Sequence, residues 1–159
     1  MTHRAFNGMF PQPSDLDEHD TELMDRINKT LSEADRQLGL CNFRHALNTI
    51  MGLAQETNRY IDLKAPWLTR KTDLPRTGTT LWVCISVLSC LRTVTHPFLP
   101  FSSQKLHELL GFTGRVEDLG WQLQEIKVGQ SFPEPTPLFT KLEESVAAEE
   151  LEHLRSQST

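Results

Sequence analysis

The sequence lacks a long uninterrupted apolar run and a leader at its N-terminus. The longest apolar stretch, residues 81–91, is interrupted by Ser86 and Ser89. It is shorter than the roughly 18 apolar residues of a membrane span, so we expect a core helix there. The N-terminus does not join a basic region to an apolar one, which argues against a secretory signal. We therefore expect a soluble, cytoplasmic chain with no membrane partner.

Grouped metal ligands and catalytic motifs are also lacking. No two of the six histidines lie three or four positions apart, and the three cysteines show neither a metal-ligand spacing nor an even disulfide framework. We interpret Cys41, Cys84 and Cys90 as buried, reduced thiols. The sequence has no phosphate-binding glycine loop and no Gly-x-Ser-x-Gly elbow. These absences predict a chain with no metal, no cofactor and no active site of its own.

The net charge of −5 is distributed unevenly. Residues 42–116 carry nine basic and four acidic side chains, which gives a local charge of +5. Residues 1–41 carry four basic and eight acidic side chains, and residues 117–159 carry three and nine. A positive middle section between acidic ends can present a surface to phosphates. The alternative is an ordinary solvated face, which is what most charge clusters are.

Two long helices are predicted in the first half of the chain. Apolar residues recur at helical spacing over residues 20–38, namely at Leu23, Ile27, Leu31, Ala34 and Leu38. Asn42 is a good N-cap for a second helix. That helix should end at Ala65-Pro66, because proline disfavours the helical conformation for the residue before it.

The second half should hold shorter helices and an extended tail. We expect a loop over residues 71–78, which contain Pro75 and Gly78, then helices over about 79–96, 102–110 and 141–155. The predicted fold is an all-α bundle of about four to five helices with an extended C-terminal segment. Residues 1–19 form a linker or turn segment that follows a missing catalytic domain. The bundle covers residues 20–118, and residues 119–159 form the tail and an acidic terminal helix that packs back on the bundle or on the catalytic domain.

One segment combines an aromatic ring with cations. Trp67 lies where the second helix should give way to a loop, and Asp62 and Asp73 are the acids near it. The surrounding basic residues are Arg59, Lys64, Arg70, Lys71 and Arg76. A projecting ring beside cations suits unpaired bases and their phosphates. The alternative, which the residue types alone favour, is that Trp67 caps the core and the cations are ordinary surface charges.

The same segment carries a family motif. Residues 54–67, Ala-Gln-Glu-Thr-Asn-Arg-Tyr-Ile-Asp-Leu-Lys-Ala-Pro-Trp, resemble the A-x-x-x-N-x-Y-I-D-x-x-x-P-W signature of the anticodon-binding domain of methionyl-tRNA synthetases. Three further matches keep the family's order. They are Phe6-Asn7-Gly8 with Pro11, then His96-Pro97-Phe98-Leu99-Pro100 with Lys105-Leu106 and Leu110-Gly111, and finally Gly129 with residues 135–143.

The resemblance implies an α-helical bundle that reads the CAU anticodon of a tRNA. Trp67 and Pro66 would inherit the role of stacking on the first anticodon base. Asn58 and Tyr60 would be structural, with the amide bonded to neighbouring backbone and the phenol fixing the turn at Trp67. Possible phosphate contacts are Arg59, Lys64, Arg70 and Lys71. The partners would be tRNA and the catalytic domain of the same synthetase, not DNA, and the parent enzyme would use ATP to attach methionine to tRNA.

The chain also departs from the family pattern. An Asn and an Arg that the family carries on a helix just before the Phe-x-Gly turn have no counterpart, because the sequence starts at Met1. Arg4 lies close to that position, but no motif assigns it a role. The catalytic signature motifs of the synthetase are absent as well. Two alternatives stay open: the bundle of another class I synthetase, and a helical protein-interaction module derived from such a domain.

Overall fold

The structure, a computed structural model, describes residues 1–141 and 144–157. Its helices are α1 (Thr2–Ala5), α2 (Glu18–Gly39), α3 (Phe43–Lys64), α4 (Pro66–Thr69), α5 (Leu74–Val94), α6 (Pro100–Leu109), a 3-10 turn η1 (Glu117–Leu119) and α7 (Glu144–Gln157). Within the described ranges there is no β-strand, only one isolated bridge between Met9 and Ser131. The all-α prediction is confirmed.

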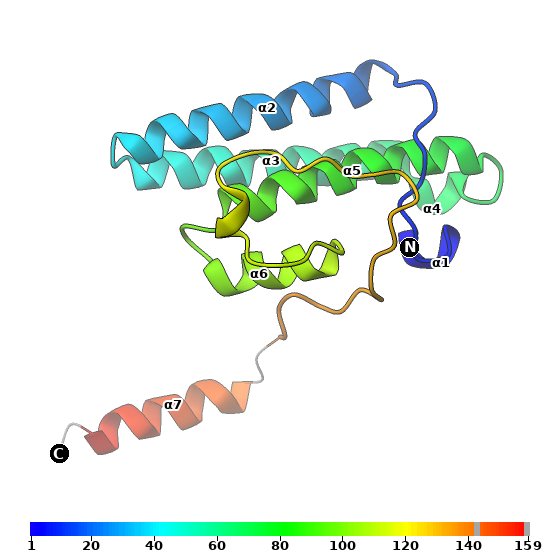
Figure 1. The fold of residues 1–159 in the computed structure, drawn as a ribbon. Coiled ribbons are helices and arrows are strands. Elements are labelled where there is room, and N and C mark those ends of the chain that lie inside the picture. Colours follow the sequence, from blue (N-terminus) through cyan, green and yellow to red (C-terminus); the bar gives the residue numbers. More distant parts are fainter. Residues whose placement is uncertain (142–143, 158–159) are drawn as a thin grey trace.

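Helices α2 and α3 form a long antiparallel pair (Figure 1). Asp17 caps α2 by accepting a hydrogen bond from the backbone N–H of Asp20, and the Asp20 side chain accepts one from the N–H of Asp17 in return. Asn42 is the residue before α3, as expected. Its side chain makes no capping bond, however, and donates to Gln37 instead, 3.0 Å away. The predicted position of this cap is right and the predicted contact is wrong.

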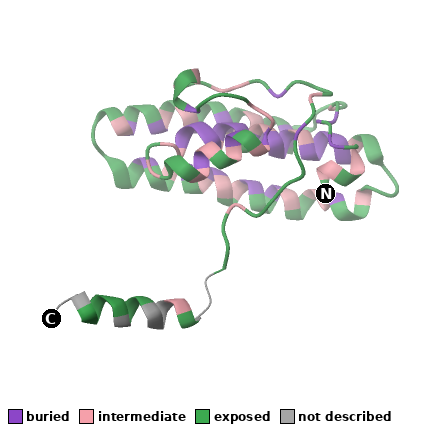
Figure 2. Ribbon diagram, turned by 60° about the horizontal axis from the view of Figure 1, so that its bottom comes forward, coloured by how far each residue is buried: buried purple, intermediate pink, exposed green. Residues whose placement is uncertain are grey.

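Helix α5 is the central helix, and purple buried residues run along it in Figure 2. By length and composition it could cross a membrane, but 83% of its apolar window is buried inside the bundle, as expected for a core helix. It begins at Leu74, five residues earlier than predicted. Pro75 fits the first turn, where its missing N–H costs nothing. Gly78 lets the N-terminal segment approach this helix closely, because a Cβ placed there would lie only 3.3 Å from atoms of Phe6 and of Pro11.

The tail after η1 runs back over the bundle and joins its core. Phe10 donates a backbone hydrogen bond to Gln130, and Phe132 donates one to Gly8. The rings of Phe10 and Phe132 stack with centroids 4.7 Å apart. Both rings belong to a second apolar cluster, whose other buried members are Ile85, Leu110 and Ile126. The two ends of the bundle segment, before α2 and after η1, therefore stabilise each other.

The thiols are not all alike. Cys84 and Cys90 are buried, and burial raises the pKa of each thiol to about 12. Cys41 is exposed, because it lies in the α2–α3 turn with a positive φ of 57°. The prediction of a buried thiol is therefore wrong for Cys41.

A buried arginine joins α5 to α6. Arg92 is fully buried, and it forms no ion pair with any carboxylate in the described part of the chain. It donates to Nδ1 of His107 at 3.0 Å and to the Thr93 hydroxyl at 3.0 Å, and it lies over the ring of Phe112. Since Nδ1 accepts this bond, the ring proton sits on Nε2, which donates to the carbonyl of Thr113. His107 is thereby held neutral.

This contact makes the stability sensitive to acid. Burial lowers the pKa of His107, and the charge of Arg92 lowers it further. The unfolded chain protonates this ring at its ordinary pKa of about 6.5, so the free energy of unfolding should fall as pH drops below that value, by at most about 1.4 kcal/mol per pH unit. Urea unfolding of His107→Gln, which keeps an acceptor and a donor but cannot titrate, should show a shallower loss between pH 6.5 and 5. The exposed control His45→Gln should keep the original slope, and equal slopes in all three proteins would refute the assignment.

Candidate nucleic-acid interface

The corner between α3 and α4 places Pro66 and Trp67. Ala65 caps α3 in the left-handed conformation, with φ 42° and ψ 57°, and its N–H donates to the carbonyl of Ile61 at 2.9 Å. Few side chains other than glycine adopt this conformation, and proline next in the chain disfavours the helical one. Pro66 then starts α4 and is buried. The second long helix therefore ends where the sequence predicted.

The ring of Trp67 lies at the surface of this corner. Its side chain is 46% exposed. Trp82 and Trp121 pack against the main apolar cluster, whereas Trp67 belongs to neither cluster among the residues that the structure describes. A short helical turn thus holds the indole partly in solvent.

A buried carboxylate on α2 contacts the end of α3 that leads into this corner. The side chain of Asp20 is fully buried. Its oxygens accept hydrogen bonds from the Tyr60 hydroxyl at 2.7 Å and from Arg76 at 2.5 Å. Burial alone would raise the pKa of Asp20, but the hydrogen bonds from Arg76 and Tyr60 lower it to about 2. We call Asp20, Tyr60, Lys64 and Arg76 the Asp20 cluster.

Two predicted roles change because of this cluster. The phenol of Tyr60 donates its hydrogen bond to Asp20 and so ties α3 to α2, whereas the sequence placed its contact at the Trp67 turn. Lys64 forms ion pairs with Asp17 and Asp20, and its side chain is 10% exposed. Because its ammonium group is already neutralised, Lys64 is a poor candidate for a phosphate contact. Arg76 is neutralised in the same way.

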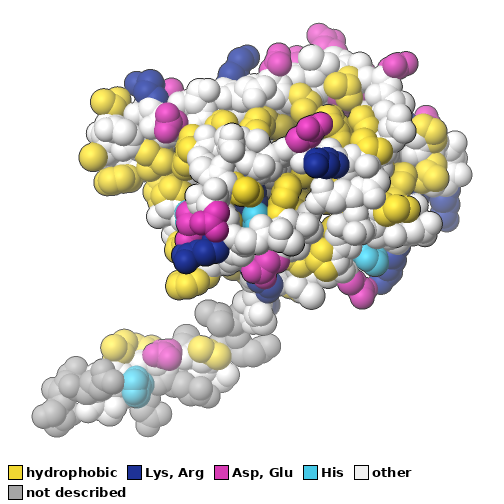
Figure 3. Space-filling view, viewed as in Figure 1, with side chains coloured by type: hydrophobic (Ala, Val, Ile, Leu, Met, Phe, Trp, Pro, Cys, Tyr) yellow, Lys and Arg dark blue, Asp and Glu magenta, His cyan; other side chains and the backbone are white. Residues whose placement is uncertain are grey.

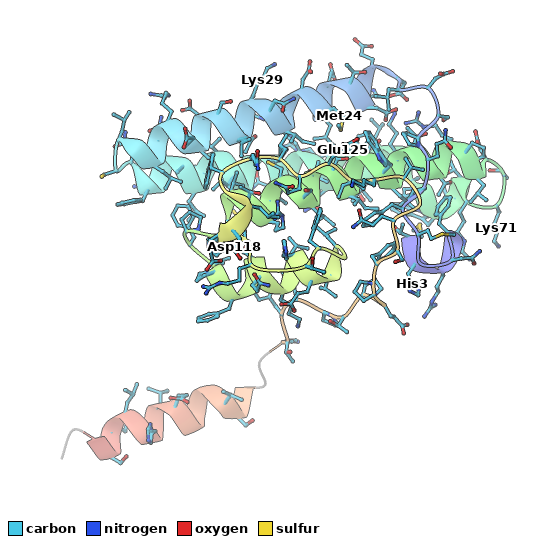
Figure 4. All side chains as sticks on the ribbon, in the orientation of Figure 1. His3, Met24, Lys29, Lys71, Asp118 and Glu125 are labelled. Carbon is cyan, nitrogen blue, oxygen red and sulfur yellow. The ribbon has the colours of Figure 1, made fainter. Side chains whose placement is uncertain are left out.

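The remaining predicted residues lie at the surface. Arg59, Arg70 and Lys71 are exposed. Lys71 lies beyond α4 at the end of the bundle where His3 of α1 also lies (Figure 4). Asn58 is exposed too, which contradicts its predicted inward packing, because it falls on the outer face of α3 between buried Thr57 and Tyr60.

A cleft that the sequence did not indicate opens at the start of α5. It has a volume of about 460 Å³ and lies between the segment before α2 and the start of α5. Its walls are Phe6, Gln12, Pro13, Ser14, Leu74, Pro75 and Gly78. The only sequence signal for it was the glycine that permits the close approach of Phe6.

Among the described residues, no group of three His, Cys, Asp or Glu side chains could hold a metal ion.

Residues 10–158 match the family model of the anticodon binding domain of methionyl tRNA ligase. The chain belongs to this family. A methionine--tRNA ligase from Dehalococcoides mccartyi is 45% identical over 128 residues, which cover 80% of this chain and 23% of that protein. One from Roseiflexus castenholzii is 36% identical, over 99% of this chain and 31% of that protein.

A solved structure agrees with this membership. The apo form of Mycobacterium tuberculosis methionyl-tRNA synthetase superposes with a TM-score of 0.81 at 25% identity. The match covers 90% of this anticodon-binding chain and 30% of that protein. The chain therefore spans about a quarter to a third of the length of these relatives.

Removal of the buried charge should destabilise the anticodon-binding bundle. Asp20→Asn would leave Lys64 and Arg76 with only the half-exposed Asp17 as counter-charge, and breaking a buried pair in this way costs on the order of 3 kcal/mol. Urea unfolding measures this loss. Asp25→Asn, an exposed residue on the same helix, is the matched control and should change stability by less than about 0.5 kcal/mol. Equal stability of the two variants would show that Asp20 does not hold the helices together.

Proposed function

We propose that this chain reads the anticodon of a tRNA for a methionyl-tRNA synthetase that works in the cytoplasm. The whole protein would attach methionine to tRNA with ATP, and this part would be non-catalytic and would associate with the catalytic domain. The observation that carries the proposal is the exposed indole of Trp67, held at a rigid corner in a member of the anticodon-binding family.

The ring is suited to stacking on an unpaired base. Anticodon bases are single-stranded, so their flat faces can meet an aromatic side chain. Stacking of this kind contributes on the order of 1–3 kcal/mol per base. Pro66 is buried next to the indole in the chain and holds the backbone of the corner in place. We assign Trp67 to the first base of a CAU anticodon, with Pro66 as its support.

The surrounding charges are suited to the backbone of the same loop. Arg70 is the cap residue directly after α4, three residues after the indole, and Lys71 follows it. Arg59 is exposed on α3, two turns before the corner. Because Lys64 and Arg76 are neutralised by Asp17 and Asp20, these three cations are our candidates for phosphate contacts. The sequence suggested more available cations than these three. The smaller number implies that the isolated domain binds tRNA weakly.

A second candidate function rests on the apolar side chains at this end. Leu63, Leu68 and Leu74 are exposed around Trp67. Such a group also suits a protein partner, as in a helical interaction module. That function would make Leu68 as important as Trp67, so a comparison of variants at these two positions separates the candidates.

Trp67→Ala should weaken binding of a CAU anticodon stem-loop at low salt. The loss of one stacked base predicts a rise in Kd of roughly 5- to 150-fold. Trp67→Phe should retain part of the affinity, and Leu68→Ala, the exposed neighbour, should retain nearly all of it. A loop with an altered anticodon should bind the wild-type chain more weakly. Equal, weak binding of both loops, unchanged by Trp67→Ala, would exclude anticodon reading, and a circular dichroism spectrum would confirm that each variant is folded.

The double variant Arg70→Gln and Lys71→Gln should weaken all loops alike. Each lost contact to a single-stranded phosphate should reduce the slope of log K against log salt concentration by about 0.7. Titrations between 50 and 200 mM salt, roughly the range over which such slopes are measured, provide the test. Lys29→Gln, an exposed change on α2, should leave the slope unchanged. An unchanged slope in the double variant would show that Arg70 and Lys71 do not contact phosphates.

A further inference from the structure

An apolar groove opens on the face of the bundle away from the α2–α3 pair. It has a volume of about 430 Å³ and is bounded by α5, α6, the start of the chain and the tail before α7. Its walls include Leu88 and Leu91 of α5, Leu99 and Leu106 beside and on α6, and Leu138 and Phe139 of the tail. The contact proposed for Trp67 does not involve any of these residues.

The groove has the properties of a binding surface. Its lining is almost entirely apolar, and Leu88, Leu99 and Phe139 are exposed at its edge. Contiguous apolar surface of this kind is unfavourable in water and commonly marks a contact site. Figure 3 shows hydrophobic side chains on the outer surface of the bundle and also on α7.

Helix α7 carries an apolar face that is exposed in the structure. It contains 14 residues, and an isolated helix of this length is only marginally stable in water. Leu151 and Leu154 lie three positions apart, on one face, and are 54% and 60% exposed. In Figures 1 and 2 the helix lies apart from the bundle. Packing of this face on an apolar surface would stabilise the helix.

The chain itself places α7 next to the groove. Phe139 is part of the groove wall, and α7 begins five residues later at Glu144. Five residues span at most about 17 Å when extended, so the first turn of the helix starts within that distance of Phe139. A short tether gives an effective concentration in the millimolar range, which favours the chain's own helix over that of a second copy.

Charge at the rim favours the same arrangement. Lys105 of α6 is exposed, and its ammonium donates to the carbonyl of Pro137 at 2.7 Å, next to Leu138 of the groove wall. Apart from its leucine face, α7 is rich in glutamate. An acidic helix that closes over this rim would meet a cation there, whereas a basic helix would be repelled.

We propose that α7 folds back on its own chain and closes the groove, with Leu151 and Leu154 inserted between α5 and the tail. The bundle would then exist in an open form, with α7 extended, and a closed form, with α7 docked. This inference concerns a groove whose walls do not include Trp67 and does not depend on tRNA binding, so either proposal can fail without the other.

Paramagnetic relaxation in the full chain tests this closure. A nitroxide is attached to Ser156→Cys in a Cys41→Ser background, where the two remaining cysteines are buried. Docking should broaden the backbone amide signals of Leu88, Leu91 and Ser102 to the same degree at every protein concentration. Leu151→Glu with Leu154→Glu should abolish the broadening, and so should Leu99→Glu in the groove. Glu150→Gln, on α7 but outside the leucine face, should preserve it.

Two results would overturn the proposal. Absence of broadening at the groove amides, with α7 helical by chemical shift, would show that the helix stays extended. Broadening that grows with protein concentration would show that the groove takes the helix of a second copy. Because each variant is altered at exposed positions, an unchanged spectrum elsewhere in the bundle confirms that the fold is intact.

Discussion

The bundle depends on one carboxylate that has been taken out of water. Asp20 belongs to α2, yet its hydrogen bonds come from Tyr60 on α3 and Arg76 on α5, so three helices meet at a single side chain. A buried charge without partners would cost several kcal/mol, and each helix must therefore keep its position for the others to be stable. The corner that carries Trp67 begins one turn after Tyr60. The end of α3 that leads into this corner is thus held to α2 and α5 by a buried charge.

Helical periodicity was enough to predict the architecture. The apolar stripe of α2, the cap position Asn42 and the proline after Ala65 predicted helix ends that differ from the observed ones by only a few residues. The start of α5 was missed because Pro75 and Gly78 are usually loop residues. Their helical roles depend on a first-turn position and on the approach of Phe6, which are relations in space.

The exposed ring of the candidate site was predictable from the sequence, but the pairing of its charges was not. Trp67 and Pro66 stand in a motif that fixes the corner. Asp17 and Asp20 stand at the start of α2, where the helix dipole favours an acid even without a buried partner. Their pairing with Lys64 and Arg76 spans more than 40 positions of sequence, and no local pattern reports it. Asn58 was misjudged for a related reason: a motif position does not say which face of a helix it occupies.

The left-handed conformation of Ala65 has a consequence for the rate and the entropy of the proposed contact with a base. Ala65 is held between two helices, so the backbone beneath the indole would have no loop to order in the proposed contact with a base. The entropy cost of fixing this part of the surface was met during folding, and the contact energy can appear as affinity. Association of a base with the indole should then require no change in the backbone conformation of the corner.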